Sequence, residues 1–188
     1  KVKAVSGATE NQFKTLEAQA KKLGATTTFT ASEVAGLQVE FAKLGFTASE
    51  IDKVTESTLY LAQAGGAELG RAAEVAGSTL RAFGLAAEET GRVTDVMASS
   101  FATSSLDMES FAEAMKTVAP IAKATGVSME EASAMLGALA NNGIKGSIAG
   151  TALKKILSDL HKEGKPMTQT FKELSNQNIS LADANDLV

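Results

Sequence analysis

The sequence has no cysteine and no tryptophan, and only one histidine, one tyrosine and two prolines among its 188 residues. The lack of cysteine excludes disulfides, thiolate chemistry and cysteine-ligated metals. Aromatic residues make up 5% of the chain, which leaves few side chains for stacking on sugars. No apolar run approaches the roughly 20 residues needed to cross a bilayer, and no signal-peptide core follows the first residues.

Neither sign of charge dominates the chain. The chain carries 18 basic and 22 acidic residues, a net charge of -4, whereas a nucleic-acid-binding surface is typically a basic stripe. We therefore expect no sequence-specific nucleic-acid binding. What the chain does have is 44% apolar residues, dominated by alanine, which favours close contact between helices.

The sequence signature of a helix start recurs along the chain. Residues 29–34 (Phe-Thr-Ala-Ser-Glu-Val) recur as residues 46–51 (Phe-Thr-Ala-Ser-Glu-Ile), and a third copy lies at residues 127–132. Each is a capping box, in which a hydroxyl and a glutamate satisfy the first free amides of a helix, and the two phenylalanine copies add a hydrophobic staple. Residues 9–12 form a weaker version without the staple.

Glycines mark the helix ends. Gly24, Gly45, Gly84 and Gly126 each follow a helical stretch, where glycine can adopt the left-handed conformation that closes a helix. After Gly84 an alanine, Ala86, stands where the capping hydroxyl belongs. We expect that helix start to be frayed or capped from elsewhere.

The apolar spacing between these marks is helical. It predicts an all-α fold of about eight short amphipathic helices, joined by tight Gly-X-Ser/Thr corners into a bundle-like arrangement, with no strand. Pro120 removes a backbone donor inside the sixth helix, which predicts a kink or a local break. The last predicted core stripe is Ile148, Ala152, Ile156 and Leu160.

The chain is predicted to have one helical domain. Residues 1–7 are a lead-in, residues 8–162 form the domain, and residues 163–188 are a linker with a short helix around 167–174 and the start of a further element. Because the chain begins without methionine and ends without a helix stop, we expect it to be a fragment of a longer protein.

No motif predicts catalysis. His161, the one histidine, lies in a helix end that favours a cation, and it has no second histidine or cysteine with which to bind a metal. The acidic pairs fall in expected first turns, where negative charge complements the helix dipole; they are Glu88-Glu89, Asp107/Glu109 and Glu130-Glu131. A glycosidase pair among them is a weaker alternative. We expect no cofactor and no metal.

Residues 143–151 (Gly-Ile-Lys-Gly-Ser-Ile-Ala-Gly-Thr) are the most suggestive stretch. Glycines, a lysine and a helix start with hydroxyls favour phosphate binding in principle, but the order differs from that of a P-loop. The structural alternative, which we favour, is a glycine turn with Ser147 as the cap and Gly150 allowing a neighbouring helix to approach.

Residues 118–128 and 139–153 together resemble the core of tail tape measure proteins of the TP901 type, from tailed phages. The similarity extends upstream over about residues 28–101 and downstream over 171–184, although Asp186 stands near where the family has a glycine. The residues that carry the core motif, assigned to packing or partner contact, are Pro120, Gly126, Gly143, Ile144, Lys145, Gly146, Gly150, Thr151 and Leu153.

The resemblance implies a structural role and no reaction. Members set the length of the tail tube in a phage or prophage tail and accompany DNA delivery. The implied location is the lumen of the virion tail, after assembly in the host cytoplasm. The implied partners are tail tube, tail-tip and tail assembly chaperone proteins and further copies of the chain, with membrane contact only during ejection. The alternative is a peptidoglycan-degrading or membrane-perturbing tail domain.

Overall fold

The structure of the chain is a computed structural model, which describes residues 2–162 and 164. These residues form an all-α fold without strands, as predicted. The helices are α1 (Val2–Ser6), α2 (Glu10–Thr26), α3 (Ala31–Lys43), α4 (Ala48–Gly65), α5 (Leu69–Phe83), the 3-10 turn η1 (Ala87–Glu89), α6 (Thr90–Thr103), α7 (Met108–Thr125), α8 (Met129–Asn141) and α9 (Gly146–Lys162). Within these residues, no helix is both long and apolar enough to cross a membrane.

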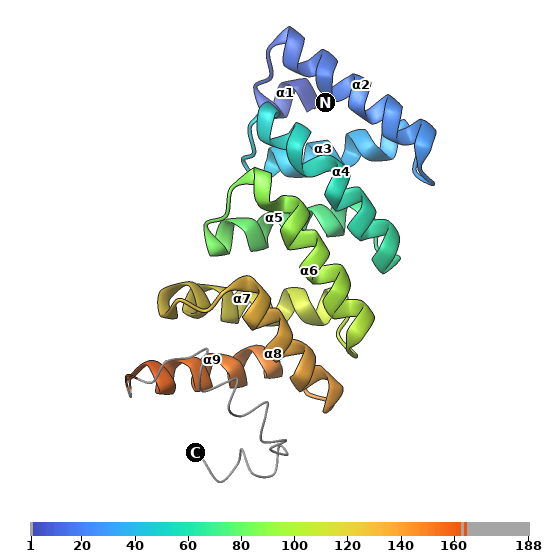
Figure 1. Ribbon diagram of the computed structural model, residues 1–188. Coiled ribbons are helices and arrows are strands. Elements are labelled where there is room, and N and C mark those ends of the chain that lie inside the picture. The colour runs from blue at the N-terminus through green and yellow to red at the C-terminus, as the bar shows by residue number, and fades with distance from the viewer. Residues whose placement is uncertain (1, 163, 165–188) are drawn as a thin grey trace. The chain divides into compact units, whose positions relative to one another are not determined.

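The chain divides into two compact units, the first ending at Ala102 and the second beginning at Thr103. In the first unit α3 packs against α1, α2, α4 and α5, and α4 packs against α2, α5 and η1 (Figure 1). Helices α1, α3 and α5 thus form one row, and α2 and α4 form another. Stacked helix pairs of this kind bury a continuous apolar seam between the rows.

The second unit repeats this principle with α7, α8 and α9. Helices α7 and α9 lie side by side and α8 packs against both (Figure 1). Lys145, just before α9, lies 3.9 Å from the carboxylate of Asp107, just before α7. The two helices therefore begin together and run in the same direction, because α8 carries the chain back between them.

The predicted capping boxes are confirmed. Thr30, Thr47 and Ser128 each accept a hydrogen bond from the amide three residues on, and that residue's glutamate accepts from the cap amide. The weaker start at Thr9 is also a complete capping box, with Gln12 as the reciprocal partner. Each cap satisfies two amides that the helix itself cannot.

Ala86, which stands where the cap after Gly84 belongs, leaves the helix start without a complete cap, as predicted. Ala86 offers no side-chain acceptor, but its amide donates to the carboxylate of Glu89 at 2.9 Å. Only this half of a capping box forms, and the chain makes the short turn η1 before α6 begins at Thr90. Before α6 the chain therefore has only the Glu89 half of a capping box, and it forms a 3-10 turn there.

One predicted helix end is wrong. Gly45, Gly84 and Gly126 adopt the left-handed conformation, but Gly24 does not, and α2 continues through it to Thr26. A Cβ atom at Gly24 would lie 2.7 Å from the Cα atom of Ala31, where α3 begins. The glycine is needed for the close approach of α3, and sequence alone does not distinguish this from a helix stop.

Of the two outcomes predicted at Pro120, a kink or a local break, the break does not occur. Helix α7 continues through Pro120 to Thr125. Pro120 and Lys116, whose carbonyl loses its helical donor, are both exposed. Water can therefore solvate that carbonyl, which limits the cost of the proline.

The predicted core stripe of the last helix is also wrong. Ile148 is 71% exposed and Ile156 37% exposed, while α9 buries Ala149, Leu153 and Leu157 instead. Both sets are spaced as one helix face, so periodicity could not choose between them. Small residues decide the matter, because Gly150, on the same face as Leu153, lets the α9 backbone lie against Ala114 of α7, where a Cβ atom would lie 2.8 Å from the carbonyl oxygen.

Two further predictions concern the ends of the chain. Residues 2–6, within the predicted lead-in, form the short helix α1, which packs against α3. The linker and short helix predicted within residues 163–188 lie outside the described residues, apart from Gly164. That residues 8–162 act as a single domain remains a prediction.

Candidate functional site

The acidic residues that a hydrolase would need are used as helix caps and ion pairs. The Lys53 ammonium donates to the carboxylate of Glu88 and lowers its pKa, and the Ala86 amide lowers the pKa of Glu89. The Ser110 amide, 2.8 Å from Asp107, lowers the pKa of that carboxyl. A general acid needs a raised pKa. These three groups are therefore held as anions, the opposite of what proton donation requires.

The other candidates lie in equally ordinary places. The carboxylate of Glu131 accepts the Ser128 amide at 2.9 Å, as part of the cap of α8. Glu109 is exposed in the first turn of α7, and His161 is exposed in the last turn of α9. Among the residues that the structure describes, no three side chains of metal-binding type come together.

The core motif lies around α7, α8 and α9. Gly126 and Gly143 are left-handed corners that close α7 and α8, with φ angles of 76° and 82°. At each corner the following apolar residue returns an amide to the helix just ended: Val127 to Ala122 at 2.8 Å, and Ile144 to Leu139 at 3.0 Å. These bonds satisfy free carbonyls at the helix end and set the direction of the next helix.

Three motif residues form the contact between α9 and α7. A Cβ atom at Gly150 would lie 2.8 Å from the carbonyl oxygen of Ala114 and 2.9 Å from its Cα atom. Gly146 and Leu153 are buried on the same face of α9. The absence of a side chain at Gly150 therefore allows the α9 backbone to lie directly against that of α7.

The remaining motif residues are more accessible. Pro120 and Thr151 are exposed, and Lys145 and Ile144 are half-buried. The Thr151 hydroxyl donates to the carbonyl of Ser147 at 2.9 Å. The motif thus contains buried packing residues and exposed ones, and its assignment to packing or partner contact remains a prediction.

The glycine-rich stretch is not arranged as a phosphate cradle. Helix α9 begins at Gly146, so Ser147 lies inside its first turn and the predicted Ser147 cap is wrong. A Cβ atom at Gly146 would lie 2.5 Å from the carboxylate oxygen of Glu113. A carboxylate at this helix start would repel a phosphate, whereas the predicted role of Gly150 in close approach agrees with its contact with Ala114.

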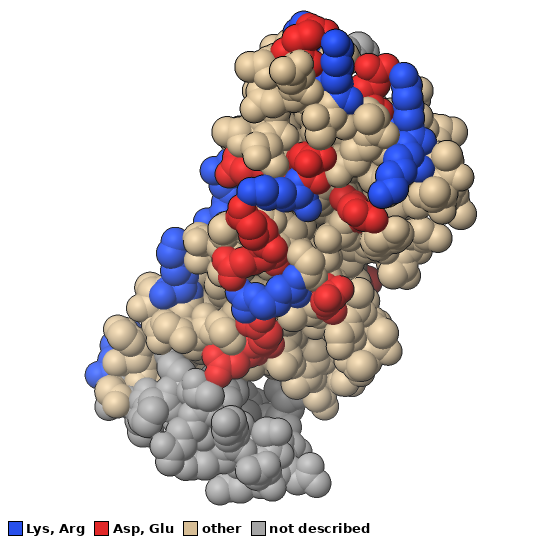
Figure 2. All heavy atoms as spheres, turned by 45° about the horizontal axis from the view of Figure 1, so that its top comes forward, with Lys and Arg blue, Asp and Glu red and all other residues tan. Residues whose placement is uncertain are grey.

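Charge follows the same mixed pattern. Figure 2 shows lysine and arginine side chains interleaved with aspartate and glutamate over the face that it draws. Several of these charges are paired along one helix, such as Lys43 with Glu40 at 2.7 Å and Arg92 with Glu89 at 2.8 Å. Interleaved charge of this kind does not concentrate the positive potential that attracts nucleic-acid phosphates.

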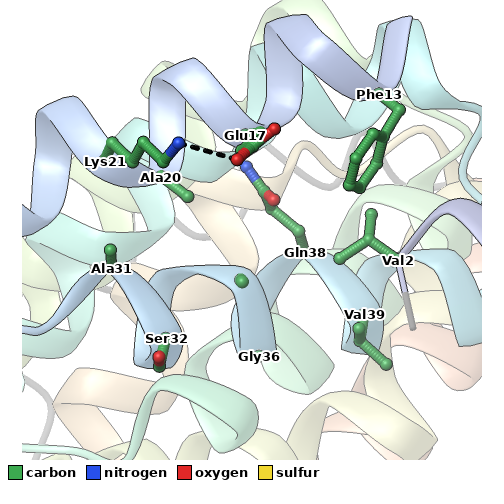
Figure 3. A pocket seen from close by; sticks show the side chains of 11 residues that line it. Val2, Phe13, Glu17, Ala20, Lys21, Ala31, Ser32, Gly36, Gln38 and Val39 are labelled. Carbon is green, nitrogen blue, oxygen red and sulfur yellow. Dashed lines mark ion pairs between the residues drawn. The ribbon is translucent and has the colours of Figure 1, made fainter. Parts of the chain in front are cut away.

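The first unit contains an open groove that sequence analysis did not identify. It has a volume of about 490 Å³ and lies along α1, α2 and α3 (Figure 3). Val2 and Phe13 lie at one end, and the Lys21–Glu17 ion pair lies along α2. Gly36 faces the groove from α3, with no atom within 4 Å of the place where its Cβ would be.

A buried amide connects the helices beside this groove. Gln38 is 1% exposed and donates to the carbonyl of Leu16 at 3.0 Å and to the amide oxygen of Gln19 at 3.1 Å. Gln19 in turn donates to the carbonyl of Asp52 at 2.6 Å. The network joins α2, α3 and α4. The only sequence signal for it was a glutamine four residues after Val34, on the buried face of α3.

Comparison with known proteins identifies the family. The family model of the phage-related minor tail proteins matches residues 17–187. The chain is 40% identical over 185 residues to the tape measure protein of Pneumococcus phage Dp-1, covering 98% of the chain and 16% of that protein. It is 32% identical over 159 residues to the probable tape measure protein of Escherichia phage P2, covering 85% of the chain and 20% of that protein.

The chain therefore spans about a fifth or less of the length of these two relatives. No solved structure matches it. The match over residues 17–187 covers far more than half of the sequence, and it includes both glycine corners and the α7–α9 contact. The chain belongs to the family of phage-related minor tail proteins.

Proposed function

We propose that this chain is a folded structural segment of a phage or prophage tail tape measure protein. The observation that carries the proposal is the similarity of 98% of the chain to a tape measure protein. On this proposal the parent protein sets the length of the tail tube, lies in the tail lumen of the virion and accompanies DNA delivery.

The chemistry of the described residues supports a role without catalysis. The carboxyl groups of Glu88, Glu89 and Asp107 have lowered pKa values and serve in caps and ion pairs. A catalytic carboxyl would instead stand in a cleft with a raised pKa. The segment acts through its surface, by contacts with tail tube, tail-tip and chaperone proteins and with further copies of itself.

The test is an in-frame deletion of the codons for residues 8–162 from the phage or prophage gene that encodes the chain. We expect tails of altered length or failed tail assembly, measured by electron microscopy of particles. If the segment contributes as extended helix, at about 1.5 Å per residue, tails shorten by about 230 Å. Particles with normal tail length and normal infectivity would refute the proposal.

A matched variant controls for catalysis. Alanine at Glu88, Glu89, Glu130 and Glu131 together removes the acidic pairs of two helix starts, those of η1 and α8, and leaves the length of the chain unchanged. We expect normal tails and normal DNA delivery from this variant at permissive temperature. Clearing of cell-wall suspensions by the unaltered chain, lost in this variant, would instead show a peptidoglycan hydrolase.

Self-association is tested separately. Sedimentation of the chain over a range of concentrations is expected to show oligomers, and immobilised chain is expected to retain tail tube or tail-tip protein. A strict monomer that retains neither would contradict the proposed partners while leaving the family assignment intact.

A further inference from the structure

Gly36 differs from four other glycines that lie inside helices. At Gly24, Gly77, Gly137 and Gly150 an added Cβ atom would lie between 2.4 and 3.2 Å from an atom of another segment, so the contact needs glycine. Gly36 is exposed in the middle of α3, and no atom lies within 4 Å of the place of its Cβ. Glycine weakens a helix relative to alanine. Among the described residues, Gly36 lacks the close contact that the other four make.

Two grooves open beside Gly36. One is the groove along α1, α2 and α3, which Gly36 faces from α3 (Figure 3). The second has a volume of about 360 Å³ and lies between α3 and the start of α5. Phe29, Leu37 and Leu69 contribute its apolar lining. A side chain from another molecule can enter this groove, and the glycine lets the backbone of a docking helix come close to α3.

The second groove is acidic. Glu33, Glu40 and Glu68 line it, and its described lining includes no lysine or arginine. The Thr30 amide lowers the pKa of Glu33, and Glu40 pairs with Lys43 at 2.7 Å. Glu68, just before α5, does not cap that helix with its side chain, and it forms no ion pair within the described part of the chain. The groove therefore favours an apolar ligand that carries a positive charge.

The outward face of α9 has this character. Ile148, 71% exposed, is the most exposed of the large apolar side chains that the structure describes. Ala152 and Lys155 follow it on the same face of the helix. Lys155 is exposed and has no ion pair among the described residues. An apolar side chain, a small residue and a cation thus lie in one row of about two helical turns, on the side of α9 that faces away from α7.

We propose that α9 of one copy of the chain docks on α3 of a second copy, with Ile148 in the second groove beside Gly36 and Lys155 against Glu68. The occupant is a second copy because the chain itself carries the complementary face, with an apolar side chain and a cation for an apolar, acidic groove. This inference rests on the proposed self-association and names its surface. Because the two faces are different parts of the chain, the contact is heterologous, and each copy offers one face to the next.

The test uses two variants that each lose one side of the contact. Gly36→Leu fills the groove with a side chain, and Ile148→Glu places a carboxylate against the acidic groove. Sedimentation velocity of the full chain is expected to show oligomers for the unaltered protein and monomers for each variant alone. An equal mixture of the variants is expected to form one-to-one dimers and nothing larger, because one variant retains its α9 face and the other retains its groove.

The outcomes separate this contact from self-association in general. Oligomers in either variant alone would overturn the contact and leave the proposed self-association intact. A mixture that remains monomeric while the unaltered chain associates would do the same. An unaltered chain that is a monomer at every concentration would overturn both proposals.

A milder substitution distinguishes the contact from an effect on folding. Gly36→Ala should raise the urea concentration at the midpoint of unfolding, because alanine favours the helix. It should also weaken association by about tenfold, because its methyl group keeps α9 of the next copy away. Gly91→Ala is the control, since its Cβ would make only an ordinary contact, 3.7 Å from the Ser57 hydroxyl, and it should leave association unchanged. Association of Gly36→Ala as strong as that of the unaltered chain would overturn the proposal.

Charge reversal tests the ion pair. Lys155→Glu and Glu68→Lys should each weaken association by about tenfold, and the chain that carries both substitutions should recover it. Lys154→Glu changes the charge by the same amount at an exposed position on another face of α9, and it should have a smaller effect. Failure of the double variant to recover association would overturn the pairing of Lys155 with Glu68, and with it the proposed contact.

Discussion

The helix pairs α2–α3 and α7–α9 use glycine in opposite ways. In α3, Gly36 faces an open groove and has no atom within 4 Å of the place of its Cβ. In α9, Gly150 lies so close to α7 that a Cβ would lie 2.8 Å from the backbone of Ala114. The first pair leaves a cavity and joins its helices through a buried amide, whereas the second joins them by direct backbone contact. Replacing the glycine by alanine is therefore predicted to have opposite effects on stability in the two pairs, because Gly36 faces a groove and Gly150 faces the backbone of α7.

The largest expected effect is at the α7–α9 contact. Gly150→Ala should lower the free energy of unfolding by about 3 kcal/mol, because the new methyl group meets backbone atoms that cannot rotate away. Gly36→Ala should raise it by up to about 1 kcal/mol, because alanine favours the helix and the groove accommodates the methyl group. Urea unfolding followed by circular dichroism measures both. Equal effects of the two substitutions would show that the contrast between the helix pairs is false.

The buried amide beside the groove should have the next largest effect. Gln38→Ala removes two hydrogen bonds inside the first unit and should cost about 2 kcal/mol. Gln63→Ala, at an exposed position of α4, should change stability by less than about 0.5 kcal/mol. Hydrogen exchange of amides in α2 and α3 distinguishes a local loosening from a global one. Unchanged exchange there in Gln38→Ala would mean that the amide network does not hold α2 to α3.

Substitutions at the helix caps should change stability less, and in both directions. Thr47→Ala should cost about 1 kcal/mol by removing the cap of α4, whereas Ala86→Ser should add about 0.5–1 kcal/mol. Ala86 already has the extended backbone of a cap residue, with φ −78° and ψ 159°, close to the −69° and 160° of Thr47. Thermal unfolding of both variants tests this. A destabilised Ala86→Ser would mean that the 3-10 turn η1 itself excludes a conventional cap.

The smallest effect is the dependence on pH. The Thr30 and Thr47 amides lower the pKa values of Glu33 and Glu50, and lowered values also occur at Glu88, Glu89 and Asp107. A carboxyl group whose pKa is lower in the folded state than in the unfolded state stabilises the fold at any pH above its unfolded pKa, which is about 4.3 for Glu. This stabilisation is lost as the pH falls through the pKa of the folded state. The urea concentration at the midpoint of unfolding should therefore decrease as the pH is lowered from about 5 to about 2.

A single neutral substitution tests this pH dependence. Glu50→Gln is expected to flatten the dependence of the urea midpoint on pH in this range, because the glutamine keeps a cap partner but no longer titrates. Lys154→Gln, on the exposed surface of α9, is the control and should leave the slope as it is. An unchanged slope in Glu50→Gln would show that the caps do not couple to pH.

Much of the fold could be predicted from the sequence because its signals are local. A capping box requires only four residues, and a left-handed glycine corner only a few more, so Thr30, Thr47 and Ser128 were predicted correctly as caps. The same reasoning predicted the incomplete start at Ala86. The family was predictable too, since the resemblance depends on residue order and not on which residues meet in space.

What the sequence could not predict depends on a second segment. Gly24 was predicted to end a helix, but it allows the close approach of Ala31 instead. For Gly150 the close approach was predicted, but its partner, Ala114, was not. For α9, two stripes had the same periodicity, and the sequence alone favoured Ile148 and Ile156 over Leu153 and Leu157. The groove beside Gln38 likewise exists only because three helices meet there.

The sequence by itself therefore determined the capped helix starts at Thr30, Thr47 and Ser128, the helix ends at Gly45, Gly84 and Gly126, the all-α class and the family, because hydrogen bonding at these helix ends is satisfied within a few residues. Tertiary structure decided which face of each helix is buried and which glycines serve contact instead of turning. These outcomes depend on distances between backbones that are far apart in the chain, and such distances are set only when the helices pack.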